Sequence, residues 1–351
     1  MVQAMARFRG GCKRSDSLTR TRRRAKPAGA ASVRHFVRLN PTQIPVPSAS
    51  PLTVLSFGEA LWDVLPRGIF LGGAPLNVAY HLSQHGIRAL PVSAIGRDFL
   101  GDEIRRRAAG WDLDLRFVAR LRGRPTGTVQ AVLDAHGAAT YRIERRVAWD
   151  RIPAPRSGRG LTAPAAIVYG SLALRERPNR LALARLFARW PDATRVLDIN
   201  LRQPFDRGEP VAWAVRHARF VKLNDEELGR LTGARVGTVA ALARAARAFA
   251  GCHHLPHVCV TAGARGAGLW WEGRWFWEPG RRVAVRDTVG SGDAFLAALL
   301  AALWKRREAP PVALAKACRL GEFVAMSDGA TPSYQCDARG NPRPAGTQSA
   351  A

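Results

Sequence analysis

The chain has 351 residues, and its 54 Lys and Arg against 27 Asp and Glu give a formal net charge of +27. This length suits one large α/β domain or two smaller ones. The apolar run Phe295–Trp304 is shorter than the ~20 residues that a spanning helix requires. We therefore expect no membrane span, and a cytoplasmic location.

The charge is concentrated near the N-terminus. Residues 1–50 hold eleven Lys or Arg and one acid, Asp16. The remaining excess of Arg is scattered, without the basic helix or aromatic stripe typical of base-reading modules. We therefore do not expect nucleic acid to be the main ligand. Residues 1–50 are predicted to be a disordered Arg-rich extension or a misassigned start, outside the fold.

The five cysteines are widely spaced and odd in number, so they predict no disulfide framework and favour a reducing cytosol. Cys252, His253, His254, His257 and Cys259 form the one cluster that suggests a metal site. Structural zinc usually draws on two separated ligand pairs. We favour the alternative, in which Cys259 is a core residue of a strand.

The first elements in chain order alternate between strands and helices. Strands are expected at residues 52–57 and 90–95, with a tight loop at Gly72–Leu76 between them. Asn77 is predicted to cap a helix at 78–85, and a second helix is expected at 102–109. Residues 126–145 then predict a hairpin of mixed polarity, with a turn at residues 135–137, that suits a flap over a site.

The second half predicts a regular α/β succession. Strands are expected at 165–169, 195–199, 220–222 and 257–261, helices at 178–190, 210–218, 225–231 and 238–250, a hairpin at 268–277, and a last helix at 311–326. Such alternation indicates a parallel sheet covered on both faces, a three-layer α/β/α fold. We expect one domain over residues 51–332 and a flexible tail at 333–351.

Polar residues follow the predicted strands at their carboxyl ends, where open parallel sheets bind ligands. Asp63 comes shortly after the first strand. Further groups are Asp198, Asn200 and Arg202; Asn224 and Glu227; Thr261 and Gly263; and Asp287 onward. Because all these ends meet at one edge of the sheet, the sequence predicts a site there.

The stretch Asp287–Phe295 carries the strongest chemical signal. Gly290-Ser291-Gly292 precede Asp293 and a run of good helix formers. A helix beginning there presents unpaired N–H groups and the positive end of its dipole, which together bind anions. A phosphate beside a carboxylate suggests phosphoryl transfer. Alone, the motif fits equally an ordinary turn with an N-terminal helix charge.

Several motifs in order resemble the ribokinase, or PfkB-type, carbohydrate kinase family, in its fructokinase-like branch. The resemblance spans Val54 to Pro332 and rests on Gly-Gly-Ala-Pro-Leu-Asn at 72–77 and Asp-Thr-Val-Gly-Ser-Gly-Asp at 287–293. Between them lie Gly-Glu-Ala-Leu-Trp-Asp at 58–63, Asp-Ile-Asn-Leu-Arg at 198–202, Lys-Leu-Asn-Asp-Glu-Glu at 222–227 and Val-Thr-Ala-Gly at 260–263.

The resemblance implies roles at matching positions. Asp293 is expected to be the general base, and the N–H groups of Gly290, Ser291 and Gly292 the anion hole. The sugar contacts implied are Asp63, Gly73, Asn77 and Arg202, where Arg202 equally fits an exposed ion pair. The hairpin at 126–145 matches the family's lid, through which relatives often form homodimers.

The resemblance also implies ATP and Mg²⁺. Asn224 and Glu227 match the Asn-x-x-Glu that places Mg²⁺ through waters, and a helix cap with an exposed acid is the alternative. Thr261, Gly263 and Gly266 are expected at the nucleotide. Asp287 and Thr288, with residues 327–329 on the far side, are expected to hold a monovalent cation such as K⁺.

The resemblance of Gly-Glu-Ala-Leu-x-Asp at 58–63 and Gly-Gly-Ala-Pro-x-Asn at 72–77 favours D-fructose, converted to D-fructose 6-phosphate. Ribose, 2-keto-3-deoxygluconate and nucleosides such as adenosine stay open, because few contacts set the choice. A hypothesis of another class is a nucleic-acid-binding protein on an inactive kinase scaffold. The intact set of motifs argues against it.

Overall fold

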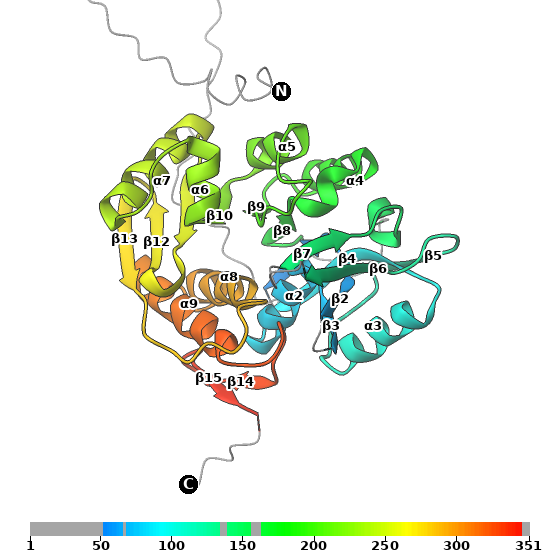
Figure 1. The fold of residues 1–351 in the computed structure, drawn as a ribbon. Helices are drawn as coiled ribbons and strands as arrows, with labels where there is room; N and C mark the ends of the chain where they lie inside the picture. The colour runs from blue at the N-terminus through cyan, green and yellow to red at the C-terminus, as the bar shows by residue number, and fades with distance from the viewer. Residues whose placement is uncertain (1–51, 66–67, 134–138, 156–162, 346–351) are drawn as a thin grey trace, which may run out of the picture. The chain divides into compact units, whose positions relative to one another are not determined.

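A nine-stranded sheet forms the centre of the protein (Figure 1). The computed structural model describes residues 52–65, 68–133, 139–155 and 163–345. The strand order is β13-β12-β11-β10-β9-β8-β1-β4-β5. All neighbours from β5 to β11 are parallel, and β12 and β13 join antiparallel. The strands are β1 (Thr53–Phe57), β4 (Arg88–Gly96), β5 (Val118–Leu121), β8 (Ala166–Gly170), β9 (Thr194–Asp198), β10 (Phe220–Asn224), β11 (His257–Thr261), β12 (Gly266–Trp271) and β13 (Arg274–Pro279).

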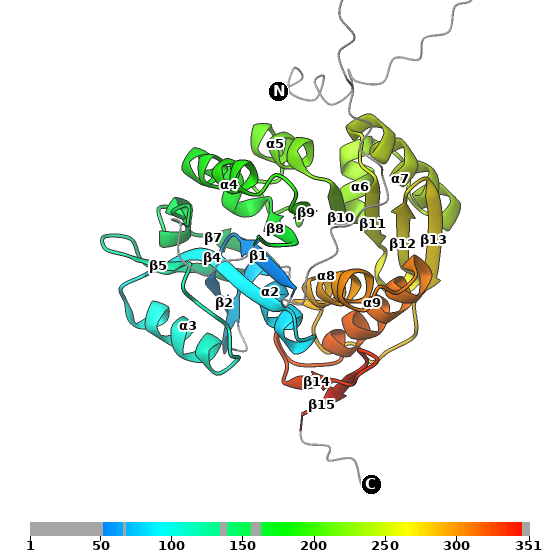
Figure 2. The same ribbon diagram turned by 180° about the vertical axis from the view of Figure 1, so that it is seen from behind.

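Helices cover both faces of this sheet, as the two opposite views show (Figures 1 and 2). One layer contains α2 (Ala74–Gln84), α3 (Phe99–Ala109), α8 (Ser291–Leu300) with a π-helical turn at Ala301–Lys305, and α9 (Pro310–Ala325). The other contains α4 (Arg177–Arg189), α5 (Glu209–His217), α6 (Asp225–Thr232) and α7 (Val239–His253), with 3₁₀ turns η1 (Ala148–Arg151) and η2 (Leu172–Arg175). A third 3₁₀ turn, η3, spans Gly263–Arg265 after β11. The predicted three-layer α/β/α fold is confirmed.

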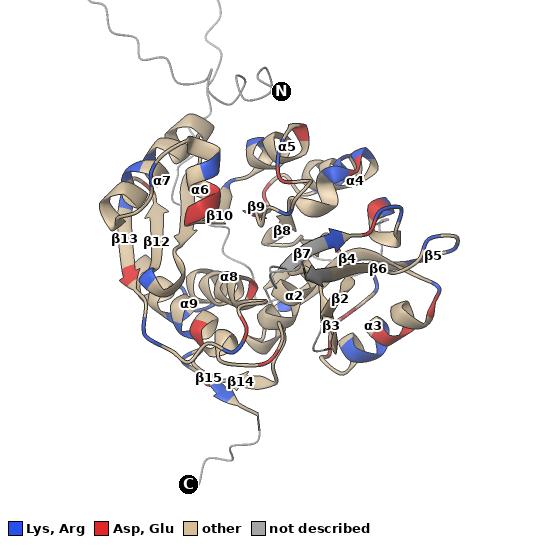
Figure 3. Cartoon of the chain, in the orientation of Figure 1, with Lys and Arg blue, Asp and Glu red and all other residues tan. Residues whose placement is uncertain are grey.

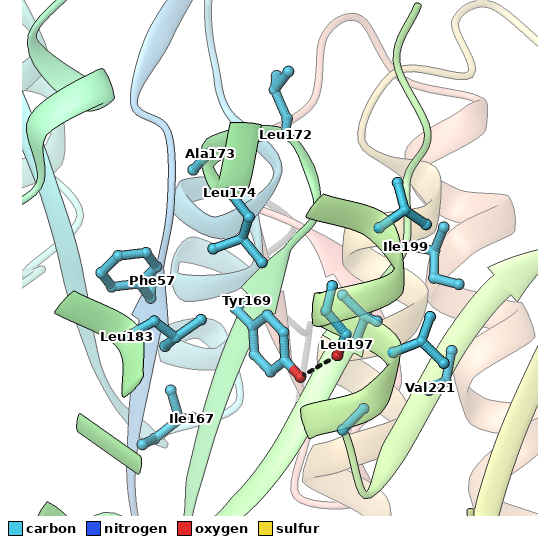
Figure 4. Close-up of a cluster of buried hydrophobic side chains, with 14 of the residues drawn as sticks. Phe57, Ile167, Tyr169, Leu172, Ala173, Leu174, Leu183, Leu197, Ile199 and Val221 are labelled. Carbon is cyan, nitrogen blue, oxygen red and sulfur yellow. Dashed lines mark hydrogen bonds between the residues drawn. The ribbon is translucent and has the colours of Figure 1, made fainter. Parts of the chain in front are cut away.

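Successive residues of a strand pack into opposite layers, because strand side chains alternate. In β8, Ile167 and Tyr169 join the core under α4 and α5, while Ala166 and Val168 join the core under α2 and α8. Figure 4 shows the first of these cores, where the hydroxyl of Tyr169 donates a hydrogen bond of 2.9 Å to the carbonyl of Ala214. A buried polar group thus finds a backbone partner within an apolar cluster.

The predicted hairpin at 126–145 is present as two antiparallel strands, which belong to a second, smaller sheet. Its order is β3-β2-β6-β7, with β2 (Leu61–Leu65), β3 (Gly68–Gly72), β6 (Gly127–Leu133) and β7 (Ala139–Ile143). The predicted turn at 135–137 lies outside the described residues. Strands β2 and β3 were not predicted, because each is five residues long and neither shows a strict alternation of polar and apolar side chains.

Helix α2 begins earlier than predicted, and Asn77 is not its N-cap. The cap is Gly73, at φ 105°, and the amide of Asn77 donates to the Gly73 carbonyl at 3.0 Å. Pro75 occupies the first turn, where its missing N–H costs nothing and its fixed φ favours the helix. The expected loop at Gly72–Leu76 is therefore the end of β3 and the first turn of α2.

The C-terminal residues also differ from the prediction of a flexible tail at 333–351. Strands β14 (Tyr334–Cys336) and β15 (Pro342–Pro344) pair antiparallel, and Tyr334 is buried. The aromatic ring of Tyr334 packs beside those of Tyr80 and Phe323, which explains its burial. Residues 346–351 and the predicted extension at 1–50 lie outside the described part of the chain.

Among the described residues, no helix combines the length and apolar character needed to cross a membrane.

Candidate active site

The start of α8 forms one wall of the candidate site. Gly290 caps the helix in the left-handed region, at φ 78°, where only glycine is free of strain. The amide of Ser291 donates to the Thr288 carbonyl at 3.3 Å, as does its hydroxyl at 2.8 Å. Within the described part of the chain the amides of Gly290 and Gly292 make no hydrogen bond. Of the three predicted anion-hole amides, those of Gly290 and Gly292 are therefore open to a ligand. The amide of Ser291 is instead bonded to Thr288.

Asp293, in the first turn of α8, is buried beside these amides. Its Oδ2 accepts a hydrogen bond of 2.9 Å from the Nδ2 of Asn77 on α2. Burial, and next the charge of Asp198, raise the pKa of Asp293 to about 7, against the lowering effects of Lys222, Asn77 and Arg202. The structure thus brings together two predicted site residues that lie 216 positions apart.

Lys222 was not among the residues predicted for the site. It lies in the middle of β10, and register places it beside Asp198, the last residue of β9. Its Nζ donates to both carboxylate oxygens of Asp198, at 3.0 and 2.8 Å. A Cβ on Gly292 would lie 2.9 Å from the same Nζ, so the ammonium lies directly against the first turn of α8. The sequence feature that could have revealed this contact is a Lys and an Asp that lie side by side on two adjacent parallel strands.

The buried charges at this sheet edge are unbalanced. Three carboxylates, those of Asp198, Glu227 and Asp293, surround the single ammonium of Lys222. Burial alone would lower the pKa of Lys222, but the charges of Asp198 and then Asp293 outweigh it, so the pKa is raised. Burial raises the pKa of Glu227, and Asp198 adds to the shift. Perturbed groups of this kind gather at functional sites.

Asn224 and Glu227 form a capping box at the start of α6. The Asn224 side chain accepts from the Glu227 amide at 2.7 Å, and Glu227 Oε2 accepts from the Asn224 amide at 2.8 Å. Glu227 Oε1 accepts a further bond of 2.7 Å from the amide of Leu201. The cap alternative is therefore present, but its acid is buried rather than exposed.

Asn224 and Glu227 are better suited to contact Mg²⁺ through water molecules than to ligate it directly. Both oxygens of Glu227 already hold backbone amides, and the described residues contain no group of three or more His, Cys, Asp or Glu arranged to hold a metal. Mg²⁺ commonly keeps several waters and takes its remaining ligands from phosphates. The excess of buried negative charge beside Lys222 also favours a divalent cation nearby.

Asp63 and Arg202 lie close enough to interact electrostatically. Burial raises the pKa of Asp63 to about 6, with Arg202 opposing the shift and Asp287 adding to it. Arg202 makes no ion pair within the described ranges, so the exposed-ion-pair alternative is not observed. Its charge also lowers the pKa of Asp293, which places its guanidinium toward the same site.

The two glycines before α2 are required by close approach. A Cβ on Gly72 would lie 2.2 Å from Asp63 Oδ2, and one on Gly73 would lie 2.4 Å from the carbonyl oxygen of Glu59. Glu59 itself is buried, and its Oε2 has no hydrogen-bond partner in the described chain. Burial raises the pKa of Glu59, while Arg202 and Arg175 partly oppose that effect.

Asp287 joins the turn before α8 to the C-terminal segment. Its Oδ1 accepts from the amide of Val289 at 3.0 Å, and its Oδ2 accepts from the amide of Gly329 at 3.3 Å. The expected proximity of Asp287 to residues 327–329 is thus present. The carbonyl of Thr288 is oriented toward Ser291, from which it accepts two hydrogen bonds.

The residues predicted at the nucleotide lie between the end of β11 and the start of β12. Thr261 pairs in register with Asn224, and Gly263 faces open space at φ 54°. Gly266 has a separate structural reason: a Cβ there would lie 2.1 Å from the carbonyl of Glu278 on β13.

The cysteine and histidine cluster forms no metal site among the described residues, and Cys259 is buried in the core as expected.

Solved structures define the class of protein. The fold matches that of fructokinase from Xylella fastidiosa with bound ATP at a TM-score of 0.69 and 22% identity, over 80% of this chain and 94% of that one. Fructokinase from Vibrio cholerae O395, solved with fructose, ADP and a potassium ion, matches at a TM-score of 0.68 and 25% identity, over 81% and 96%. The fold is ribokinase-like.

Sequence comparison then gives the family. The model of the pfkB family of carbohydrate kinases matches residues 67–335. Fructokinase from Klebsiella pneumoniae is 30% identical over 295 residues, 78% of this chain and 93% of the relative. Fructokinase from Rhizobium leguminosarum is 31% identical over 276 residues, 71% and 79%. The chain belongs to the pfkB family and is a sugar kinase.

Proposed function

We propose that the protein transfers the γ-phosphoryl group of ATP to a primary hydroxyl of D-fructose, giving D-fructose 6-phosphate. The observation that carries this proposal is the buried Asp293 carboxylate, bonded to Asn77 and adjacent to the open amides of Gly290 and Gly292. The relatives named fructokinase support the choice of sugar.

Asp293 is the proposed general base. A pKa of about 7 leaves a large fraction of the carboxylate ionised at neutral pH and close in basicity to what proton transfer favours. Asn77 holds Oδ2 through its Nδ2, while its buried Oδ1 has no partner within the described residues. An amide offers both a donor and an acceptor, so Asn77 suits a sugar hydroxyl as well as the base.

The start of α8 and Lys222 are proposed to receive the transferred group. Phosphoryl transfer is catalysed mainly by positioning and by charge stabilisation. The amides of Gly290 and Gly292 supply fixed dipoles, and the Lys222 ammonium adds a full charge against Gly292. The hydroxyl of Ser291 is engaged with Thr288 and is not assigned a role.

Mg²⁺, when bound with ATP, would neutralise phosphate charge. The residues proposed near it are Asn224 and Glu227, acting through water. Thr261 and Gly263 are proposed at the nucleotide, and Gly266 supports that loop. A monovalent cation such as K⁺ is proposed beside Asp287 and Thr288.

Asp63, Gly73 and Arg202 are the proposed sugar contacts, with the four-stranded sheet as a lid that excludes water. Asp63 lies on β2 of this sheet, opposite Phe70 of β3. A Cβ on Gly329 would lie 3.4 Å from the Phe70 ring, so the sheet touches the segment behind the anion hole. Pairing of two copies through this sheet stays a prediction, checked by sedimentation.

The test is ADP release by the purified full chain with Mg²⁺, with and without K⁺. The panel is fructose, ribose, 2-keto-3-deoxygluconate and adenosine. We expect fructose to give the highest kcat/KM. A higher value for another member reassigns the sugar, and no turnover on any member rejects the proposed function.

A chain beginning at residue 51 separates this function from nucleic-acid binding. A kinase of the proposed kind keeps its activity after that deletion. A polyelectrolyte binder instead loses a strongly salt-dependent affinity.

A further inference from the structure

Buried hydrogen bonds join α2 to the C-terminal segment. The Tyr80 hydroxyl donates to the carbonyl of Pro332 at 2.6 Å. His81 is fully buried, with Nε2 2.9 Å from the carbonyl oxygen of Ala330 and Nδ1 2.8 Å from the Tyr334 hydroxyl. A carbonyl only accepts, so Nε2 carries the proton and Tyr334 donates to Nδ1. Tyr334 therefore fixes the tautomer and the ring orientation of His81.

The segment held by His81 lies directly behind the start of α8. A Cβ on Gly290 would lie 2.5 Å from Ala330 Cα and 2.7 Å from the Ala330 carbonyl oxygen. The preceding residue, Gly329, donates its amide to Asp287. Residues 329 and 330 thus support the turn that holds Gly290 at its positive φ.

Helix α2 contacts the candidate site at two points one turn apart. Asn77 bonds the Asp293 carboxylate, and His81, four residues later on the same helix face, bonds Ala330. One rigid element therefore sets both the orientation of the carboxylate and the position of the backbone behind the anion hole.

We propose that His81, oriented by Tyr334, is a positioning residue that holds Ala330 against Gly290 and thereby aims the open amides of Gly290 and Gly292. This inference rests on the proposed function of those amides. It assigns the C-terminal strand β14 to the working enzyme, although β14 lies beyond the predicted end of the domain.

The proposal predicts an effect on kcat rather than on sugar affinity. Charge on the transferred group grows in the transition state, so misaimed donors slow the chemical step. Among the proposed sugar contacts, Asp63 and Arg202 lie on other elements, and Asn77 bonds Asp293 without involving His81, so the KM for the sugar should change little. A side chain that only stabilises the fold would alter neither quantity in the surviving folded enzyme.

Four variants of the full chain test this. Tyr334→Phe is expected to lower kcat about 10-fold, and His81→Leu about 100-fold, the range that small misplacements of reacting groups produce. His81→Gln, which can still donate to Ala330, should recover part of the loss. Tyr169→Phe is the matched control, because it removes an equally buried tyrosine hydrogen bond to a carbonyl in the other core (Figure 4).

Amide hydrogen exchange over residues 286–296 gives a readout independent of turnover. We expect faster exchange in Tyr334→Phe and His81→Leu, including at Ala294, whose amide donates to Gly290 at 2.9 Å, and no change in Tyr169→Phe. If the wild type turns over no sugar, the proposed function fails, and exchange alone decides the positioning role. Unchanged kcat and exchange in both His81 and Tyr334 variants would overturn the inference.

Discussion

Two buried ion pairs in this protein have similar chemistry and different surroundings. Arg175 and Asp150 have side chains 3% exposed each, and those of Lys222 and Asp198 are 9% and 4% exposed. Arg175 donates to both oxygens of Asp150 and to the carbonyl of Glu144. Its guanidinium also lies over the rings of Trp149 and Phe205, at 4.1 and 4.5 Å. This pair ties the strand end after β7 to the turns η1 and η2.

The Lys222–Asp198 pair differs because two further carboxylates, Glu227 and Asp293, share the same ammonium. Outside this pair, many Lys, Arg, Asp and Glu residues lie on the outer helices (Figure 3). A buried pair with balanced charge mainly specifies structure. At the Lys222–Asp198 pair, burial first and then the charge of Asp198 raise the pKa of Asp293, which suits the proposed role of general base.

The largest effect is expected for Asp293→Asn, which keeps the shape of the side chain and removes its basicity. We expect kcat to fall ~10³-fold, within the range that general-base catalysis supplies. ATP affinity, measured by calorimetry, should be retained. A rate near that of the wild type would reject Asp293 as the base.

Lys222→Met should lower both kcat and stability. It removes a charge beside the anion hole, for which we expect a loss of ~10²-fold in kcat. It also leaves Asp198 buried without its partner, at a cost of about 3–5 kcal/mol in unfolding free energy. The double variant Lys222→Met with Asp198→Asn should regain stability in urea titration but not kcat; recovery of both would make the pair structural.

Arg175→Leu should break only the structural pair. Unfolding free energy is expected to fall by about 3–5 kcal/mol, because Asp150 is left buried and unpaired. The kcat per folded molecule should stay close to that of the wild type, measured below the melting transition. A kcat loss comparable to that of Lys222→Met would remove the distinction between the two pairs.

The smallest effect is expected at an exposed cluster on α3, where Glu103 accepts from Arg106 and Arg107. Solvent screens such pairs, and they add little to stability. Glu103→Gln should leave the melting temperature and kcat unchanged. A clear drop in melting temperature would show that surface charge, too, carries stability here.

Local sequence patterns predicted the central sheet well. Apolar runs such as those of β8 and β11 indicate buried strands by themselves, and the parallel topology then brings the strand ends together. This places Asp198, Asn224 and Asp293 at one edge without knowledge of any contact. The same logic, applied to register, would have paired Lys222 with Asp198.

The missed features depend on partners distant in sequence. Strand β2 is stabilised by pairing with β6, and β14 is held by packing of Tyr334 on α2 residues more than 250 positions earlier. No local pattern encodes such contacts. The error at Asn77 has a local cause instead. Pro75 occupies the first turn of α2 and Gly73 caps it, so the helix begins before Asn77.

The most direct test of this account is the pH dependence of kcat/KM for fructose in the wild type, with Asp293→Asn as its control. Asp293 works as a base only when ionised, so the rate should rise with pH through about 7 and then level off. The same raised pKa means that the folded protein binds more protons than the unfolded chain, so Asp293 makes stability fall as pH rises from about 4 to 7. A fructose-dependent rate with that midpoint, absent from Asp293→Asn, is the predicted result. A rate that stays flat down to pH 5, or no fructose-dependent rate at all, would contradict it.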